Sequence, residues 1–527
     1  MMLASATIHL PHISYLAVAP EAVLLIGAIV VLAASSLTRG GLRQVTATTV
    51  TVLASAGALV AGLVQWHHVM ATGSSSTIDG SIALDGLSTF MTITVAAVLV
   101  LVTLIGHDYL VREQISTTEY HVLALASASG AIVMSQANDL MVLFIGLEIL
   151  SIALYVLAAF NPRRSESGEA ALKYFLLGGF SSAIFVYGIA LTYGATGTTN
   201  ISAIARFLGG TDLPHHGLLY AGLGLMLVGF AFKVAAVPFH LWTPDVYQGS
   251  PTPVTGFMAS IAKVGAFAGL LRVLYVLFAQ EASVWQPIIY AVAVASLVLG
   301  ALVSLRQRNI KRMLAYSSIN HTGFILLGVE AGTFRGLSSS LFYLFTYAVM
   351  TAGTFGVVSL LGDSGDADHD LTRYRGLARR QPLLGGCLSV LLLAQAGIPF
   401  TTGFVAKFGV VLASIEAHSW PLALIAMITA GIAVSFYLHV VLLIVSAEPS
   451  RSDPPIDSSG ASPSTVKANR SVLLEDVEEQ LTAPSLVAIS PAAGTAIVLS
   501  TLATVVFGIW PEPVLSFSSA AAHALLG

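Results

Sequence analysis

The segment NDLMVLFIGLEILSIALYVL (Asn138–Leu157) indicates what kind of protein this is. Glu148 is the only charged residue between Leu140 and Phe160. A helix crosses the hydrocarbon core of a bilayer with about 20 apolar residues, and this run is long enough to do so. The segment therefore predicts a transmembrane helix that carries one carboxylate near its middle. A charge at that depth is costly, so Glu148 is also a candidate functional residue.

The composition of the whole chain agrees with this interpretation. Of 527 residues, 56% are hydrophobic and only 9% are charged, whereas soluble domains carry about 25% charged residues. No basic stretch is dense enough to bind nucleic acid. The single cysteine, Cys387, has no partner for a disulfide, and no pair of histidines has zinc-ligand spacing beside cysteines or carboxylates. We therefore expect an all-α polytopic membrane protein without a metal site.

The chain contains fourteen apolar runs that are candidates for membrane spans. The first is expected to be a retained helix rather than a signal peptide, because no basic region precedes it and no convincing cleavage site follows it. Since fourteen is an even number, both termini are expected on one side of the membrane. The runs are approximately 16–37, 43–66, 84–106, 120–135, 140–160, 170–194, 217–244, 253–279, 286–305, 310–329, 336–362, 383–415, 419–446 and 485–510.

The basic residues fall mainly on one side of this arrangement. The connections that follow even-numbered spans contain only Arg206 and Arg335. Most of the others lie in connections after odd-numbered spans. By the positive-inside rule that side is cytoplasmic, so both termini are expected outside. The residues on the basic side are Arg39, Arg43, Arg112, Arg163, Arg164, Arg306, Arg308, Lys311, Arg312, Arg373, Arg375, Arg379, Arg380, Arg451, Lys467 and Arg470.

Spans four to eight resemble spans nine to thirteen in outline. The seventh span contains VAAVPFHLW (Val234–Trp242) and the twelfth contains AQAGIPFTTGF (Ala394–Phe404), so Pro238 and Pro399 interrupt two helices at comparable places. Membrane helices tolerate such breaks where protein or water covers the freed backbone groups. A simple kink is the alternative at each proline. Because five spans is an odd number, the two units would be inserted in opposite orientations, as in many transporters.

The same pattern divides the chain into five parts. Ser74–Asp85, with Asp79-Gly80 at its centre, predicts a small outer hairpin. Glu448–Thr482 is polar and rich in Ser, Pro and Asp, so we expect a cytoplasmic loop peripheral to transport, with a short acidic helix at Ser471–Leu481. The expected parts are a three-helix segment (1–119), a first five-helix repeat (120–280), a second, inverted five-helix repeat (285–447), the polar loop (448–484) and a last transmembrane helix (485–527).

Four charged residues lie deep inside spans: Glu148, Lys233, Lys263 and Lys407. Each costs about 2.5–3.5 kcal/mol at the bilayer centre on insertion scales. All four are too central for their side chains to reach the interface. A structural ion pair explains Glu148 together with one lysine. It does not explain three lysines, so we expect a functional role for this group.

Buried lysine and glutamate side chains are suited to proton transfer. An apolar environment disfavours the charged form of each, so that a small change in electric field can move a proton. His240 follows Lys233 by seven residues, beyond the Pro238 break, and histidine titrates near neutrality unaided; an interfacial histidine is the alternative. Glu169 and Lys173 form an i, i+4 pair at the mouth of the sixth span, a pattern that a plain helix pair explains equally well.

Five motifs resemble one family. Together they are similar to the signature of the proton-antiporter-like subunits of respiratory complex I, the NADH:quinone oxidoreductase, over nearly the whole chain. The motifs are Asn138–Leu157 quoted above, EAALKYFLLG (Glu169–Gly178), PFHLWTPDVYQGSPTPVTGFMASIAKVGAF (Pro238–Phe267), LAYSSINHTGF (Leu314–Phe324) and AGIPFTTGFVAKF (Ala396–Phe408).

The resemblance implies a proton-relay role for the buried charges. One departure concerns the repeat: Lys407 follows its proline by eight residues whereas Lys233 precedes its own by five, so the two lysines are not strict repeat mates. The implied roles are Glu148 and Lys233 as the coupled pair of a first half-channel, Lys263 as the central lysine, Lys407 as the terminal lysine of a second half-channel, His240, Glu169 and Lys173 as supporting residues, and His321 as a weaker candidate.

The resemblance also implies a setting for the chain. It would be a multi-pass subunit in a bacterial plasma (inner) membrane, contacting lipids and the other membrane and peripheral subunits, neighbouring antiporter-like subunits included. The sequence has no nucleotide-binding glycine motif and no cysteine cluster, so FMN, iron–sulfur clusters and quinone are expected in partner subunits. The alternatives are a subunit of a multisubunit sodium/proton antiporter, a self-sufficient transporter for an organic solute, and a structural scaffold.

Overall fold

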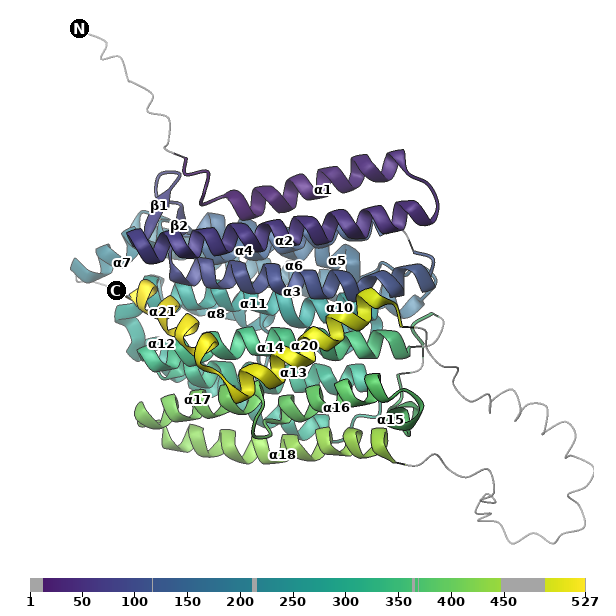
Figure 1. Cartoon of the computed structure of the whole chain (residues 1–527). Coiled ribbons are helices and arrows are strands. Elements are labelled where there is room, and N and C mark those ends of the chain that lie inside the picture. Colours follow the sequence, from purple (N-terminus) through teal and green to yellow (C-terminus); the bar gives the residue numbers. More distant parts are fainter. Residues whose placement is uncertain are drawn as a thin grey trace, which may run out of the picture.

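A computed structural model of the chain describes residues 13–115, 117–210, 216–362, 365–367, 369–446 and 489–526. In this part the protein is a bundle of roughly parallel helices with one small β-hairpin (Figure 1). The polar loop expected at 448–484, including the short helix expected at Ser471–Leu481, lies outside the described residues.

The N-terminal part contains three long helices and the predicted hairpin. The hairpin strands pair antiparallel with Ser76 opposite Ala83, which confirms the turn predicted at Asp79-Gly80. Asp85 then caps the third helix, because its side chain accepts a hydrogen bond from the Ser88 amide. The elements are α1 (Ala19–Leu37), α2 (Gly41–Thr72), β1 (Ser75–Thr77), β2 (Ile82–Leu84) and α3 (Gly86–Arg112).

The middle of the chain forms shorter and less regular elements. A run from Thr252 to Leu277 alternates between α- and π-helix, and neither this winding nor α7 was expected from the sequence. The elements are α4 (Thr117–Gln136), α5 (Leu140–Ala158), α6 (Ser165–Thr196), α7 (Ile201–Gly210), α8 (Gly217–Lys233), α9 (Trp242–Gly249), α10 (Thr252–Phe257), η1 (Met258–Ala262), α11 (Lys263–Arg272), η2 (Val273–Leu277) and η3 (Ala279–Glu281).

The last part again begins with long helices. Helix α14 packs against α3, α13, α17 and α20, and nearly all of its residues are buried, so it lies near the centre of the bundle. The elements are α12 (Ala282–Ser304), α13 (Ile310–Glu330), α14 (Phe334–Leu361), η4 (Leu371–Tyr374), α15 (Leu377–Arg380), α16 (Pro382–Ala396), α17 (Thr402–Glu416), α18 (Trp420–Val445), α20 (Pro491–Ile509) and α21 (Glu512–Leu526).

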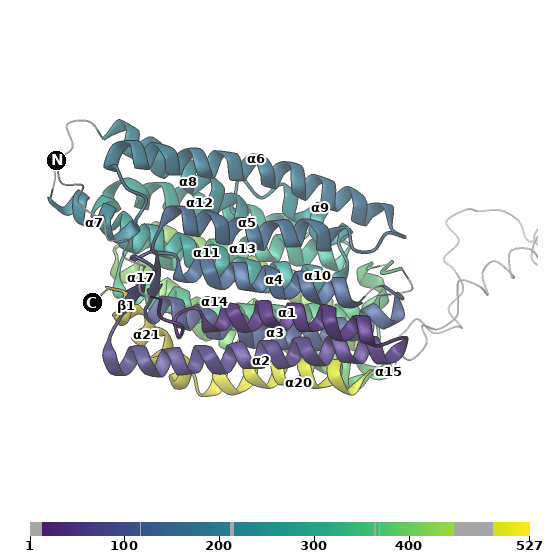
Figure 2. The same ribbon diagram turned by 90° about the horizontal axis from the view of Figure 1, so that it is seen from above.

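Ten helical segments among the described residues are long and apolar enough to cross a membrane, and three shorter helices are also apolar. Seen from above, α6 and α8 lie on one side of the bundle, and α2 and α20 lie on the other (Figure 2). Outward-facing residues such as Ile152, Leu176 and Leu442 are apolar and exposed. These features define an all-helical polytopic membrane protein.

Two predicted breaks are present. Helix α8 ends at Lys233 and α9 begins at Trp242, with Pro238 between them. Helix α16 ends at Ala396 and α17 begins at Thr402, with Pro399 between them. Proline lacks the N–H that a helix needs, which is why the helical hydrogen bonding stops at both places.

A third break was not predicted. Helix α20 ends beside the break between α16 and α17, where a Cβ on Gly508 would lie 2.3 Å from the Thr401 Cα. After Pro511 the chain turns into α21, which reaches the hairpin: the Ser74 hydroxyl donates to the Ala524 carbonyl at 3.0 Å. The span expected at 485–510 contains α20, which is long and apolar enough to cross a membrane, and α21, which was not expected, continues along the bundle to the hairpin end (Figure 1).

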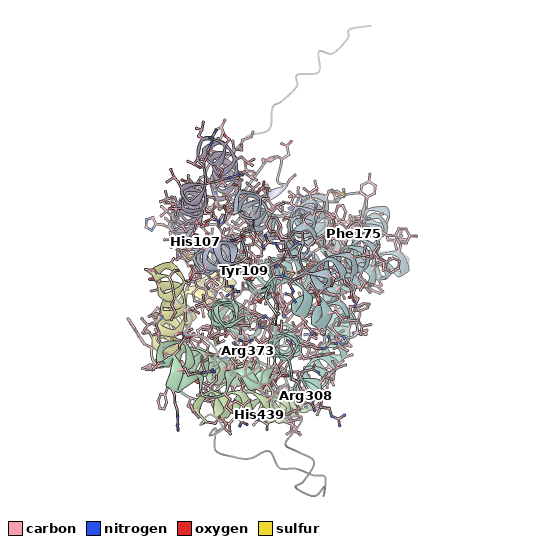
Figure 3. All side chains as sticks on the ribbon, turned by 90° about the vertical axis from the view of Figure 1, so that its right-hand side faces the viewer. His107, Tyr109, Phe175, Arg308, Arg373 and His439 are labelled. Atoms are coloured by element: carbon pink, nitrogen blue, oxygen red, sulfur yellow. The ribbon has the colours of Figure 1, made fainter. Side chains whose placement is uncertain are left out.

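The two ends of the bundle differ in charge. We call one the basic end, where the helices begin or end near Arg163, Arg164, Arg308 and Arg373, and the other the hairpin end, where β1 and β2 lie. Figure 3 looks onto the basic end, with Arg308 and Arg373 labelled. The described chain starts and finishes at the hairpin end (Figure 1).

Candidate functional site

Glu148 lies halfway along α5 and is half-buried against α6. Its Oε1 accepts a hydrogen bond of 2.5 Å from the Ser182 hydroxyl of α6. Among the described residues it forms no ion pair with Lys233, whose hydrogen bonds go to hydroxyls, although the two were expected to be coupled. The carboxylate therefore rests on a neutral hydroxyl rather than on a countercharge.

Lys233 is the last residue of α8 and is buried. Its Nζ donates to the Ser151 hydroxyl at 2.7 Å and to the Tyr174 hydroxyl at 3.1 Å. Ser151 lies on α5 one turn after Glu148, and a cavity of about 10 Å³ lined by Ser151, Ser182 and Lys233 has room for roughly one water. Glu148 and Lys233 are thus brought together through hydroxyls and a water-sized space.

The break after α8 connects Lys233 to the next lysine. The carbonyl of Val234, which no longer takes part in a helix, accepts a hydrogen bond of 2.7 Å from the Thr322 hydroxyl of α13. The same hydroxyl accepts a hydrogen bond of 2.8 Å from the Nζ of Lys263. The Thr322 hydroxyl therefore links the free carbonyl next to Lys233 with the ammonium group of Lys263.

Lys263 lies where the π-helix η1 meets α11 and is 2% exposed. Its Nζ donates to the Ser318 carbonyl at 2.8 Å and to the Ser318 hydroxyl at 2.5 Å. The Tyr347 hydroxyl of α14 donates to the same Ser318 hydroxyl at 2.9 Å. Every hydrogen-bond acceptor of Lys263 among the described residues is a neutral oxygen, and π-turns of this kind occur often at functional sites.

His321 continues the polar row on α13 and is fully buried. Its Nδ1 lies 2.7 Å from the Tyr343 hydroxyl, and its Nε2 lies 3.0 Å from the Tyr437 hydroxyl of α18. The Tyr437 hydroxyl also bonds to Ser317 and donates to the Gln395 Oε1 at 3.3 Å. This histidine, a weak candidate from the sequence, therefore lies in the interior network between Lys263 and the second break.

Lys407 lies on α17, after the second break. Its Nζ donates to the Ala396 carbonyl at 2.9 Å, which is the last carbonyl of α16. The ammonium also lies 4.9 Å from the centre of the Phe324 ring. Gly397 allows this approach: it has φ +91°, and a Cβ there would lie 2.9 Å from the Lys407 Cδ.

The remaining candidates lie apart from this row. Lys173, which is half-exposed at the basic end, forms the expected pair with the exposed Glu169 at 2.7 Å and a second pair with Asp245 at 3.0 Å. His240 is buried in the first break, but no hydrogen bond links it to Lys233 in the part of the chain that the structure describes. Among the described residues, no hydrogen bond therefore joins Glu169, Lys173 or His240 to the buried lysines.

The hydroxyl partners were missed by sequence reasoning. Ser151, Ser182, Ser318 and Thr322 each touch a candidate charge, yet serine and threonine are common in membrane helices and give no signal alone. The spacing of Ser318 and Thr322, one turn apart on a span that also carries His321, is the signal that could have indicated a polar face. Among the described residues no group of three or more His, Cys, Asp or Glu could hold a metal ion.

Comparison with known proteins places these residues in a family. Residues 137–433 match the family described as NADH:quinone oxidoreductase/Mrp antiporter, TM. NADH-quinone oxidoreductase subunit N of Mycobacterium tuberculosis is 43% identical over 79% of this chain and 73% of its own length. Subunit N of Saccharopolyspora erythraea is 48% identical over 65% of this chain and 67% of its own length.

Solved structures of membrane complexes contain chains with a similar fold. A chain of respiratory complex I from Thermus thermophilus, with bound aureothin, superposes with a TM-score of 0.74 at 31% identity, covering 94% of this chain and 98% of that one. A chain of the Mrp complex from Dietzia sp. has a TM-score of 0.80 at 22% identity, covering 97% of this chain and 99% of that one, and shows the shared fold.

Fold and site together define an antiporter-like membrane subunit, with interrupted helices and buried lysines. The sequence comparisons narrow this class. The chain belongs to the family of subunit N of NADH-quinone oxidoreductase.

Proposed function

We propose that this chain, as a subunit of a bacterial NADH-quinone oxidoreductase, carries protons across the plasma membrane through the buried row that runs from Glu148 to Lys407. One observation supports this most strongly. Lys233, Lys263 and Lys407 are all buried, and their described hydrogen-bond acceptors are neutral oxygens. A buried amine without a carboxylate partner has a destabilised charged form, so it can release and regain a proton.

The contacts between the lysines support a relay. Ser151, Thr322, His321 and Tyr437 are hydroxyl or imidazole groups that both donate and accept hydrogen bonds. Protons move along such groups and intervening waters without a large change in structure. In this proposal Glu148 modulates Lys233 through its charge, Lys263 is the central site, and Lys407 is the end of the row in this chain. His240, Glu169 and Lys173 act as supporting groups nearer the basic end.

The proposal includes a membrane arrangement of the same helices. Fourteen crossings are assigned, and both termini lie outside, because the basic end is then cytoplasmic. The parts are residues 1–119, 120–280, 285–447, 448–484 and 485–527. The crossings are α1, α2, α3, α4, α5, α6, α8 with α9, α10 to η2, α12, α13, α14, α16 with α17, α18, and α20 with α21.

Two isolated backbone bridges support the inverted repeats. Asp139, which caps α5, bridges to Asn200 beyond α6, and Asn309, which caps α13, bridges to Asp370 beyond α14. The residues of the second bridge each lie 170 positions after those of the first. The first bridge lies at the hairpin end and the second at the basic end. Equivalent contacts at opposite ends are what two oppositely inserted units produce.

Redox chemistry belongs to partner subunits in this proposal. FMN, iron–sulfur clusters and quinone bind there, and this chain contributes proton transfer. The fold shared with the Mrp complex keeps a subunit of a multisubunit sodium/proton antiporter as the alternative. Purification in mild detergent distinguishes the two, because flavin- and iron–sulfur-containing partners accompany only a subunit of the oxidoreductase.

The test of the relay uses Lys263. Lys263→Arg keeps a charge that stays protonated at any accessible pH, and Lys263→Met removes the ionisable group. Both variants are expected to lose NADH-driven proton pumping and the linked quinone-reductase turnover, with assembly preserved. Arg206→Met, at an exposed position on α7, serves as the control. Wild-type pumping in Lys263→Arg would reject the relay role of this lysine.

A further inference from the structure

A cavity of about 780 Å³ opens at the basic end. Helix α6, helix α9, the two residues before α13 and the described residues 365–367, 369 and 370 line it. Its walls carry both signs of charge, with Arg164, Lys173 and Arg308 on one hand and Glu169, Asp245 and Asp366 on the other. A wall of mixed sign does not select an anion or a cation. It suits water, and therefore protons.

Asp366 fixes the inner wall of this cavity. It is fully buried and accepts hydrogen bonds from the Thr252 amide at 3.0 Å and the Thr252 hydroxyl at 2.7 Å. It also pairs with Lys311 at 3.2 Å and with Arg164 at 3.1 Å. Burial alone would raise the pKa of Asp366, but Lys311 and the hydrogen bonds outweigh it and hold the pKa below its ordinary value. The carboxylate therefore stays ionised.

His369 lies against this carboxylate and lines the cavity. Its Nε2 is 2.8 Å from the Asp366 Oδ1, so Nε2 carries the hydrogen and Nδ1 has a free lone pair. Nδ1 is buried and has no hydrogen-bond partner among the described residues, so it is a polar atom that a water entering from the cavity would satisfy. The charged groups that face the ring are Asp366, Lys311 of α13 and Arg164 before α6. Burial, Lys311 and Arg164 lower the pKa of His369 and Asp366 raises it, with a net lowering.

The cavity reaches towards the lysine row. Helix α9 forms the partition: Asp245 and Gln248 face the cavity, whereas Tyr247 is buried and its hydroxyl lies beside Ser318, the partner of Lys263. Helix α13 leads in the same direction, because Ser318 follows Lys311 by seven residues, about 10 Å along the helix. The floor of the cavity is therefore about two helical turns from the centre of the relay.

We propose that this cavity is the mouth through which cytoplasmic protons reach the relay, and that His369 is the group that takes them up. This rests on the proposed function and on the cytoplasmic position of the basic end. Nδ1 of the neutral ring accepts a proton from a water that enters from the cavity, and the imidazolium then gives the proton to a water on the inner side. The ring returns to its neutral form. Asp366 remains ionised throughout and positions the ring.

The first test removes the imidazole. His369→Ala in the assembled complex is expected to slow NADH-driven generation of membrane potential by roughly tenfold or more. Added imidazole should restore the rate, and methylated imidazoles should restore it in the order of their basicity. A merely structural role would not produce that order. His439→Ala, at an exposed position of α18 near the same end (Figure 3), serves as the control.

The second test does not depend on the folding of the first variant. Ala367→Cys places a thiol on the exposed wall of the cavity, and Ala159→Cys places one at the same end outside it. A cationic thiol reagent added on the cytoplasmic side should slow pumping in Ala367→Cys and not in Ala159→Cys. The native Cys387 is buried.

Three results would overturn the proposal: normal pumping in His369→Ala, a loss that no imidazole restores in an intact complex, or no effect of modified Ala367→Cys. Any of these together with a loss of pumping in Lys263→Arg would leave the proposed function intact. If pumping persists in Lys263→Arg as well, the proposed relay fails with it.

Discussion

The two interrupted helices hold their lysines in different ways. Lys233 lies before its break and donates to side-chain hydroxyls, while the freed carbonyl of Val234 is bound by Thr322 from another helix. Lys407 lies after its break and itself donates to the freed carbonyl of Ala396. The first lysine has a carboxylate nearby, because Glu148 binds Ser182 and Lys233 binds Ser151, and both serines line one water-sized cavity. The hydrogen bonds of the second reach no carboxylate among the described residues.

If the two units are repeats, as proposed above, this difference separates the part that they share from the part that they do not. The break recurs in both units, because a freed carbonyl inside the membrane offers a polar contact in apolar surroundings. The lysine position does not recur, so each unit uses its break differently. In the first unit, the proposed role of Glu148 is to adjust the proton affinity of Lys233 by its charge. In the second unit, the Ala396 carbonyl accepts the hydrogen bond of Lys407. Lys407 therefore also satisfies a buried backbone group.

The largest expected effect separates these two roles. Lys233→Met and Lys407→Met should both reduce proton pumping by roughly tenfold or more, because each removes a proton-carrying group. Only Lys407→Met should also lower the thermal stability of the complex, by about 1–3 kcal/mol, because it leaves the buried Ala396 carbonyl without a donor. Pumping in vesicles and thermal unfolding of the purified complex measure both. Equal loss of stability in the two variants would contradict the comparison.

Glu148→Gln should have a smaller effect and act on the first half alone. Glutamine still accepts the hydrogen bond from Ser182 but removes the charge that acts on Lys233. Pumping should fall roughly threefold to tenfold, the range that about one pKa unit of charge interaction gives. Glu416→Gln, at an exposed position on α17, is the control. Unchanged pumping in Glu148→Gln would show that Lys233 needs only the hydroxyls of Ser151 and Tyr174, and no nearby charge, to transfer protons.

The third prediction concerns the backbone of the second break. Gly397→Ala should destabilise the complex by about 1–2 kcal/mol, because alanine is strained at φ +91° and its Cβ would press on Lys407. Gly386→Ala is the control, inside the helix α16 that Gly397 caps, where a Cβ would meet nothing within 4 Å. If both variants melt at the same temperature, Gly397 is not required for the approach of Lys407.

The smallest effect is expected at the first break. Ala235 has φ +60°, a conformation that glycine adopts without strain. Ala235→Gly should therefore raise the stability of the complex by about 1 kcal/mol or less, with pumping unchanged. The same thermal measurement applies. A clear loss of stability would mean that packing of the Ala235 methyl group stabilises the first break by more than the strained backbone costs.

The sequence predicted the features that depend on local chemistry. Pro238 and Pro399 marked two breaks correctly, since proline removes a helical hydrogen bond wherever it stands. Asp79-Gly80 marked the hairpin, since both residues tolerate positive φ. Pro511 also lacks the N–H that a helix needs, but it follows the apolar run 485–510, which is long enough to be a complete span. It was therefore interpreted as an end and not as a third break.

The partners of the buried charges could not be predicted in the same way. Lys233 and Ser151 are 82 residues apart in the chain, and Lys263 and Ser318 are 55 apart. Which serine meets which lysine depends on the rotation of each helix in the bundle, and hydrophobic runs without a polar face do not fix that rotation. Asp366 and His369 were missed for a related reason: they lie in a connection, where charged residues are ordinary.

The segment from Thr252 to Leu277 contains two π-helical turns, so its side chains would be displaced by the gain or loss of a single residue. Each π-turn, η1 and η2, contains more residues than an α-turn, as if a residue had been added to an ordinary helix at that point. Removing one residue would close the wide turn and rotate everything on one side of it by about 100°. Lys263 or Arg272 would then face a different neighbour. The alignment of this helix with any relative therefore depends on insertions and deletions as much as on substitutions.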